Sequence, residues 1–403
     1  MKGLWRNRVF LLIVGSDILQ NLAIWVRNMA LLFLVMEKTN SDPIAVSLLT
    51  VMEYAPIFIF SFIGGALADR WNPKRTMIAG DLLSALSICI ILLFLELGYW
   101  EALFAAILVS AIVSQFSQPS SSKVFKRHVE EQYVSSAIAI TQSMQSLFLI
   151  IGPVVGTFLY TKLGLHASLY SLIVIFIVSA VLLMFLPTWE QIQDHANSSF
   201  IQDIKEGWGY VFQHCDLFLL TIVFCIVGLA AGLVQPLEVF LVTERLGLEK
   251  EGVQYLSTAA GIGLLGGGVV AIAAQKLSPK VVLVGGLVFL AIASVVEVMS
   301  TLFWLTATMR FMTGMFLASV NIVVGTFMIK LVPENMVGRI NGTITPLFMG
   351  TLLLGSAMAG SLMEATSLIT VFAISALLVA CAIVPALRMK MKITKASEET
   401  TAI

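Results

Sequence analysis

Charged residues are scarce in this sequence of 403 residues: they make up 12%, whereas hydrophobic residues make up 58%. Soluble domains have about 25% charged residues. So few charges cannot cover the surface of a water-soluble body of this length, which excludes a soluble enzyme and a disordered chain. The 24 Lys and Arg residues equal the 24 Asp and Glu residues in number. The chain therefore lacks the basic excess that nucleic-acid binding requires.

Cysteine and histidine are also rare, with four residues of each. Three cysteines lie inside apolar runs and one just before such a run, as expected of small buried hydrophobic residues. The histidines lie in polar connections and do not have the spacing of metal ligands. The sequence has no Gly-x-x-x-x-Gly-Lys-Ser/Thr loop for a nucleotide phosphate. We therefore predict no disulfide framework, no metal site, no cofactor and no ATP hydrolysis by this chain.

Long apolar runs are abundant, and a helix of about 20 such residues spans a bilayer. Twelve runs of about this length begin near Val9, Ile44, Thr76, Ala102, Val134, Ala167, Leu217, Val253, Val281, Trp304, Val337 and Thr366. The sequence predicts an all-α polytopic membrane protein with twelve transmembrane helices in two six-helix bundles. The expected parts are an N-terminal bundle (1–187), a central loop with an interfacial helix (188–216), a C-terminal bundle (217–388) and a tail (389–403).

The connections on one side of these spans carry most of the lysines and arginines. Positively charged loops stay on the cytoplasmic side of a membrane. We therefore expect both termini and the central loop to be cytoplasmic, in a cell membrane that is bacterial. The two halves also share a short repeat, because Pro-Lys follows the second span at 73–74 and the eighth at 279–280.

Six ionisable residues lie well inside the predicted spans, where a charge costs roughly 2.5–3.5 kcal/mol at a helix centre. Four spans also carry polar residues on one helical face. These stripes supply the cavity and substrate candidates Gln20, Asn21, Arg27, Asn28, Ser114, Gln118, Gln235, Arg310 and Asn321. The alternative interpretation is helix packing through small and hydroxyl residues.

Matched depth on neighbouring spans predicts two ion pairs, Arg27 with Glu53 and Glu297 with Arg310. Either pair can be purely structural, because removing one partner leaves the other charge buried. This pairing leaves Asp17 and Glu238 without a base. A desolvated carboxyl group without a cationic partner can exchange a proton near physiological pH. Asp17 and Glu238 are thus the first candidates for proton coupling, and Glu53 is the next.

Two motifs carry a resemblance to a known family. The loop after the second span reads Gly64-Gly-Ala-Leu-Ala-Asp-Arg-Trp-Asn-Pro-Lys-Arg75, which resembles the Gly-x-Leu-Ala-Asp-Arg-x-Gly-Arg-Lys signature of the major facilitator superfamily, although Asn72 replaces the second glycine. The resemblance implies a conformational latch formed by Gly65, Asp69, Arg70, Lys74 and Arg75. The fifth span contains Gly152, Pro153 and Gly156, similar to the core of the superfamily's antiporter signature. A kinked, closely packed helix explains the same residues.

Shorter stretches, such as Gly15-Ser-Asp17 and 203–208, resemble the branch of macrolide-efflux proteins and siderophore exporters. The resemblance implies two bundles around a central cavity lined by spans 1, 4, 7 and 10, which are the four spans with polar stripes. The fourth span has no basic residue at 102–118, so a proton route through the family's arginine there is not expected.

We interpret the sequence as a secondary active transporter, not an enzyme, that couples efflux of amphipathic, cationic, drug-like molecules to proton antiport. The expected partners are a small-molecule substrate, protons and the lipid bilayer, and the expected state is a monomer. One alternative is a dedicated exporter or carrier of one metabolite, siderophore or lysolipid. A non-transport alternative is a membrane sensor or assembly factor.

Overall fold

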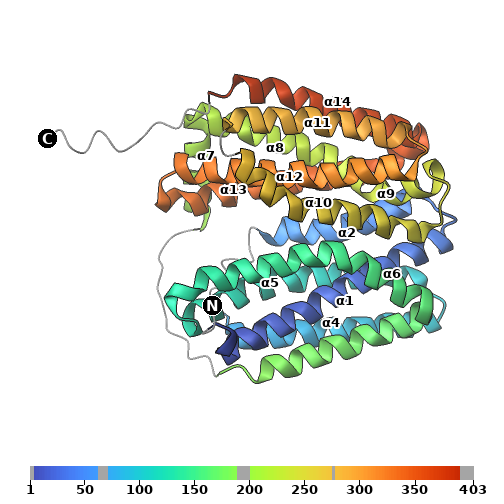
Figure 1. Cartoon of the computed structure of the whole chain (residues 1–403). Coiled ribbons are helices and arrows are strands. Elements are labelled where there is room, and N and C mark those ends of the chain that lie inside the picture. Colours follow the sequence, from blue (N-terminus) through green and yellow to red (C-terminus); the bar gives the residue numbers. More distant parts are fainter. Residues whose placement is uncertain (1–3, 62–70, 188–199, 275–276, 391–403) are drawn as a thin grey trace.

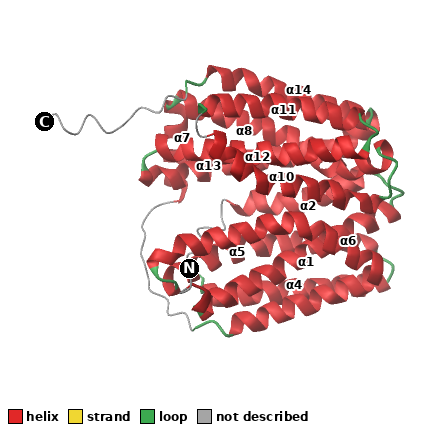
Figure 2. Cartoon of the chain, viewed as in Figure 1, coloured by secondary structure: helices red, strands yellow, loops and turns green. Residues whose placement is uncertain are grey.

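A computed structural model describes residues 4–61, 71–187, 200–274 and 277–390. All regular elements in these ranges are helical (Figure 2). The N-terminal half contains the short helices η1 (Leu4–Arg6) and η2 (Trp100–Ala102) and the long helices α1 (Arg8–Lys38), α2 (Pro43–Ser61), α4 (Pro73–Glu96), α5 (Leu103–His128) and α6 (Glu131–Met184). Helix α6 is interrupted at Gly164, whose φ of 77° is unfavourable for residues with a side chain. The interruption divides α6 into 131–163 and 165–184.

The C-terminal half begins with α7 (Phe200–Gln213) and α8 (Cys215–Val234). After α8 the chain continues through η3 (Gln235–Leu237), α9 (Glu238–Phe240) and the π-helical turn η4 (Leu241–Arg245). The remaining elements are η5 (Lys250–Gly252), α10 (Val253–Ala274), α11 (Pro279–Met299), α12 (Phe303–Leu331), α13 (Glu334–Ala365) and α14 (Leu368–Arg388).

The helices begin within a few residues of the predicted spans. In the described part of the chain, nine helices are long and apolar enough to cross a membrane. Helices α5 and α10 and the second segment of α6 are further apolar segments. Together with the nine helices, they are consistent with the predicted twelve spans. The predicted all-α, polytopic fold class is thus confirmed.

The two halves lie side by side, with their helices roughly parallel to one another (Figure 1). We call the end that carries α7, the start of α1 and the end of α14 the terminal face, and the opposite end the far face. At the far face one hydrophobic cluster joins both halves and includes Phe33 of α1, Phe240 of α9 and Phe372 of α14. Near the terminal face, Phe10 and Ile340 belong to separate clusters, one in each half. The apolar packing therefore holds the halves together at the far face.

The Pro-Lys repeat occupies equivalent positions in the two halves. Lys74, at the start of α4, donates a hydrogen bond to the carbonyl of Met184 at 2.8 Å and another to that of Leu186. Lys280, at the start of α11, donates to the carbonyl of Leu387 at 2.5 Å. Each lysine thus binds carbonyl groups at the end of its half's last long helix, where such groups lack helical partners.

Helix α7 packs on the start of α13. Glu206 and Arg339 form an ion pair at 2.6 Å. A side chain at Gly207 would lie 2.6 Å from the Arg339 carbonyl oxygen, so only glycine permits this approach.

Candidate functional site

A cavity of about 350 Å³ lies between the two halves. Its walls are mainly apolar and include Trp25 and Met29 of α1, Leu49 of α2 and Val253 of α10. Polar side chains also line it, namely Asn28, Thr50, Glu53, Tyr54, Gln235, Glu238 and Ser257. This combination of apolar walls and a few polar groups is typical of small-molecule sites.

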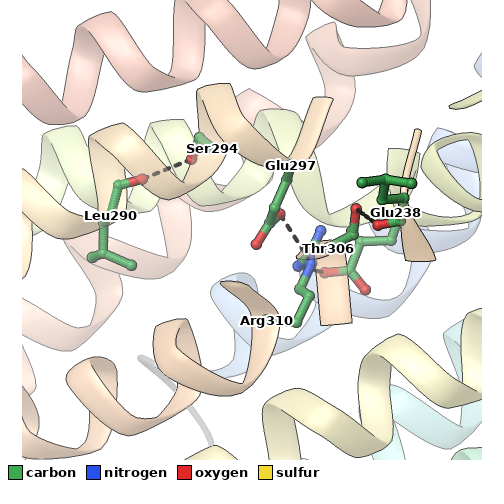
Figure 3. Close-up of polar contacts among 7 residues, drawn as sticks. Glu238, Leu290, Ser294, Glu297, Thr306 and Arg310 are labelled. Atoms are coloured by element: carbon green, nitrogen blue, oxygen red, sulfur yellow. Dashed lines mark hydrogen bonds and ion pairs between the residues drawn. The ribbon is translucent and has the colours of Figure 1, made fainter. Parts of the chain in front are cut away.

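Beside this cavity, Arg310 of α12 binds two carboxylates (Figure 3). Its Nη1 lies 2.6 Å from Oε1 of Glu238, and its Nε lies 3.0 Å from Oε2 of Glu297. The side chains of Arg310 and Glu297 are 10% and 4% exposed, whereas that of Glu238 is 27% exposed and lines the cavity. The predicted Glu297–Arg310 pair is confirmed. The prediction that Glu238 lacks a base is wrong, because one guanidinium group serves both acids.

Arg27 and Glu53 are connected through Asn28 and not directly. Nε and Nη2 of Arg27 donate to Oδ1 of Asn28 at 3.1 and 2.8 Å. Nδ2 of Asn28 in turn donates to Oε1 of Glu53 at 3.4 Å. Among the described residues no ion pair joins Arg27 to Glu53, so the predicted direct pair is corrected to a bridged one. Nη1 of Arg27 is buried without a hydrogen-bond partner in the described chain.

The charges around the cavity do not cancel. Three carboxylates (Glu53, Glu238 and Glu297) and two guanidinium groups (Arg27 and Arg310) leave one excess negative charge when all are ionised. Because Arg310 binds two of the acids, Glu53 is the cavity carboxylate without a direct ion pair in the described chain. Next to it, the Tyr54 hydroxyl accepts a hydrogen bond from Nε2 of Gln235 at 2.9 Å, which connects the two halves across the cavity.

A second polar group lies inside the N-terminal half. Gln20 donates to Oδ1 of Asp81 on α4 at 2.8 Å and to the Ser16 hydroxyl at 3.3 Å. Asp81 is 3% exposed and is the charged neighbour of Asp17. Among the described side chains none makes a hydrogen bond or ion pair with the Asp17 carboxylate. The sequence reasoning missed Asp81 because it lies near the end of its span. Its burial follows from the packing of α4 against α5 and α6.

The other predicted residues are dispersed. The Asn21 amide donates to the backbone carbonyl of Asp17 at 2.8 Å, and the Ser114 hydroxyl donates to the Ala111 carbonyl of its own helix at 2.8 Å. Asn321 lines a different cavity in the C-terminal half. The side chain of Gln118 lies outside the described part. The latch residues Gly65, Asp69 and Arg70 are also outside it, whereas Lys74 and Arg75 lie in the first turn of α4.

The glycines of the fifth-span motif bring α6 against α1. A Cβ at Gly156 would lie 2.7 Å from the carbonyl oxygen of Trp25 and 2.9 Å from the Met29 side chain. A Cβ at Gly152 would overlap the Trp25 indole ring. Pro153 lies inside the helix between them. This geometry supports the packing interpretation of the motif.

We expect Gly156→Ala to lower the free energy of unfolding by about 1–3 kcal/mol, because backbone atoms of α1 cannot move away from the new methyl group. Thermal denaturation of the protein purified in detergent measures the effect. Gly285→Ala is the matched control, because a Cβ at this helical position meets no atom within 4 Å. Equal melting temperatures for the two variants would contradict the close approach of α1 and α6.

Polar contacts of Lys250 also hold the two halves together at the far face. Its Nζ donates to the Phe33 carbonyl at 3.3 Å and lies 4.0 Å from the Glu37 carboxylate. Lys250 precedes α10 in the C-terminal half, and both partners belong to α1. These contacts connect the C-terminal half to α1 between the central cavity and the far face.

Comparisons with known proteins agree with this architecture. The family model of the Major Facilitator Superfamily matches residues 17–296 and 220–401. The MFS-type transporter YkuC of Bacillus subtilis is 24% identical over 86% of this chain and 83% of its own length. Macrolide efflux protein A of Streptococcus pyogenes is 27% identical over 48% of this chain and 49% of its own length, so that similarity spans about half of each protein.

Comparison with solved structures supports the same helical transporter fold. A point mutant of the nucleoside transporter NupG superposes with a TM-score of 0.78, covering 95% of this chain and 100% of the NupG chain at 14% sequence identity. Two helical halves with a cavity between them, and a family model that matches most of the sequence, lead to one conclusion: the chain belongs to the Major Facilitator Superfamily of transporters.

Proposed function

We propose that this transporter exports amphipathic organic cations in exchange for protons, and that Glu53 is the carboxylate for which the two compete. The observation that carries the proposal is the excess negative charge beside an apolar cavity, with Glu53 free of a direct ion pair in the described chain. The similarity to a macrolide efflux protein supports efflux of drug-like molecules.

The charge balance around the cavity couples binding of the cation to release of the proton. A proton on Glu53, or one monovalent cation beside it, neutralises the charged group around the cavity. Both together would leave a net positive charge in a medium of low dielectric constant, which is unfavourable. Binding of the cation therefore favours the ionised carboxylate and expels the proton, and a returning proton releases the cation. Mutual exclusion at one site gives antiport when the transporter changes conformation only with the cation or the proton bound.

The direction of transport that we propose depends on the orientation of the protein in the membrane. Most lysines and arginines of the described chain lie in or next to the connections at the terminal face, which supports its placement in the cytoplasm. With the far face closed, a conformation open at the terminal face would let an exporter take up substrate from the cytoplasm. The latch between the second and third spans remains part of this proposal, as a device that controls the conformational cycle.

Exchange in proteoliposomes tests the function. We expect a pH gradient to drive movement of the lipophilic cation tetraphenylphosphonium against its concentration gradient. The same cation should release protons from purified protein in weakly buffered detergent. Proton release that is absent for tetraphenylphosphonium and for other organic cations would contradict the proposal. Loss of proton release in Asp17→Asn, with retention in Glu53→Gln, would move the coupling site to Asp17 and Asp81.

A further inference from the structure

A second cavity, of about 550 Å³, lies within the C-terminal half. Helices α8, α11, α12 and α13 surround it, and it has no lining residue in common with the central cavity. Its lining extends from Val223 to Ala231 of α8, from Leu317 to Gly325 of α12 and from Ile340 to Phe348 of α13, which corresponds to about 12 Å along each helix axis. Its volume is within the range of about 300–1,000 Å³ that accommodates drug-sized ligands.

The chemistry of this second cavity differs from that of the central one. Its lining residues are apolar except for Asn321 of α12 and Thr345 of α13, and none of them is ionisable. A charged ligand would therefore lose its hydration without gaining a counter-ion. Within the described chain, neither the Asn321 amide nor the Thr345 hydroxyl has a hydrogen-bond partner. Both side chains are exposed, so they are available to a polar group of a ligand.

We propose that this second cavity binds neutral, lipophilic, drug-sized molecules through apolar contacts and a hydrogen bond to Asn321 or Thr345. Apolar cavities exclude water and bind apolar molecules, and this one adds a donor and an acceptor that fix the orientation of a ligand. The site is independent of Glu53 and of proton exchange. The transporter thus has one site for cations between its halves and another for neutral molecules inside its C-terminal half.

Photolabelling with benzophenone tests this site directly. Benzophenone is neutral and apolar, its ketone accepts a hydrogen bond, and irradiation attaches it to nearby C–H bonds. In protein reconstituted into lipid nanodiscs, we expect saturable labelling of peptides from the four helices around the second cavity. The derivative 4-(trimethylammoniomethyl)benzophenone has the same ring system with a fixed positive charge. It should label these peptides at least about tenfold less, and excess tetraphenylphosphonium should not displace benzophenone.

Two matched variants separate binding in the cavity from partition into lipid. Ala231 lines the cavity and is exposed within it, so Ala231→Phe should fill the space and abolish saturable labelling. Ala373 is an exposed residue of α14 that does not line the cavity, so Ala373→Phe should label normally. Asn321→Val should weaken labelling several-fold. Labelling that does not saturate, that is equal for the charged derivative, or that persists in Ala231→Phe would overturn the proposal.

Discussion

Replacing Glu53 with glutamine is expected to reduce proton-coupled efflux to the level of protein-free liposomes. The amide keeps the size of the side chain and its contact with Asn28 but cannot bind or release a proton. It also removes the excess negative charge around the cavity, so tetraphenylphosphonium should bind more weakly. Transport driven by a pH gradient and substrate-induced proton release measure the two consequences separately.

Glu96→Gln is the matched control, because Glu96 ends α4 with a side chain that is 67% exposed and lies outside the cavity. This variant should transport at the wild-type rate. If Glu53→Gln also released protons at the wild-type level on binding the cation, Glu53 would not be the coupling residue. Exchange of substrate down its own gradient, with no pH gradient, checks that the variant protein still undergoes the transport cycle.

Replacing Arg310 with methionine is expected to cause the largest loss of stability, about 3–5 kcal/mol. Methionine preserves much of the side-chain volume but leaves the buried Glu297 and the half-buried Glu238 without their shared cation. The expected results are a lower melting temperature in detergent and a lower yield of folded protein. Arg388→Met, at the exposed end of α14, removes a positive charge without this effect.

A triple variant distinguishes the loss of ion pairs from a general defect of packing. Combining Arg310→Met with Glu238→Gln and Glu297→Gln removes all three charges and should recover a large part of the stability. A triple variant as unstable as Arg310→Met alone would show that packing of the arginine stem, and not its charge, is what the protein requires.

The sequence was sufficient to locate the helices, because spans of about 20 apolar residues are fixed by bilayer thickness alone. Depth counted from a short turn also predicted the Glu297–Arg310 pair, since the two helices on either side of that turn are neighbours. Counting residues from a turn could not reveal the partner of Glu238. That residue follows Pro236, where α8 passes into a 3-10 turn, and its contact with α12 depends on tertiary packing.

The remaining errors came from assuming that each base binds one acid. A guanidinium group has five N–H donors and can bind two carboxylates at once, as Arg310 does here. Conversely, the amide of Asn28 separates Arg27 from Glu53 although their depths match. Depth gives the position of a residue along a helix axis, whereas its partner is set by the rotation of that helix and by side-chain length.

The hydrophobic cluster shared by both halves at the far face has a thermodynamic consequence. A conformation that opens this face must separate Phe33 from the cluster residues of the C-terminal half, which include Phe240 and Phe372, and must expose apolar surface to water. Exposure of apolar surface increases heat capacity. The enthalpy difference between the closed and the open conformation therefore changes with temperature, and the population of the open conformation follows a curved van't Hoff plot. The temperature dependence of the opening equilibrium is thus set in part by the residues that close the far face.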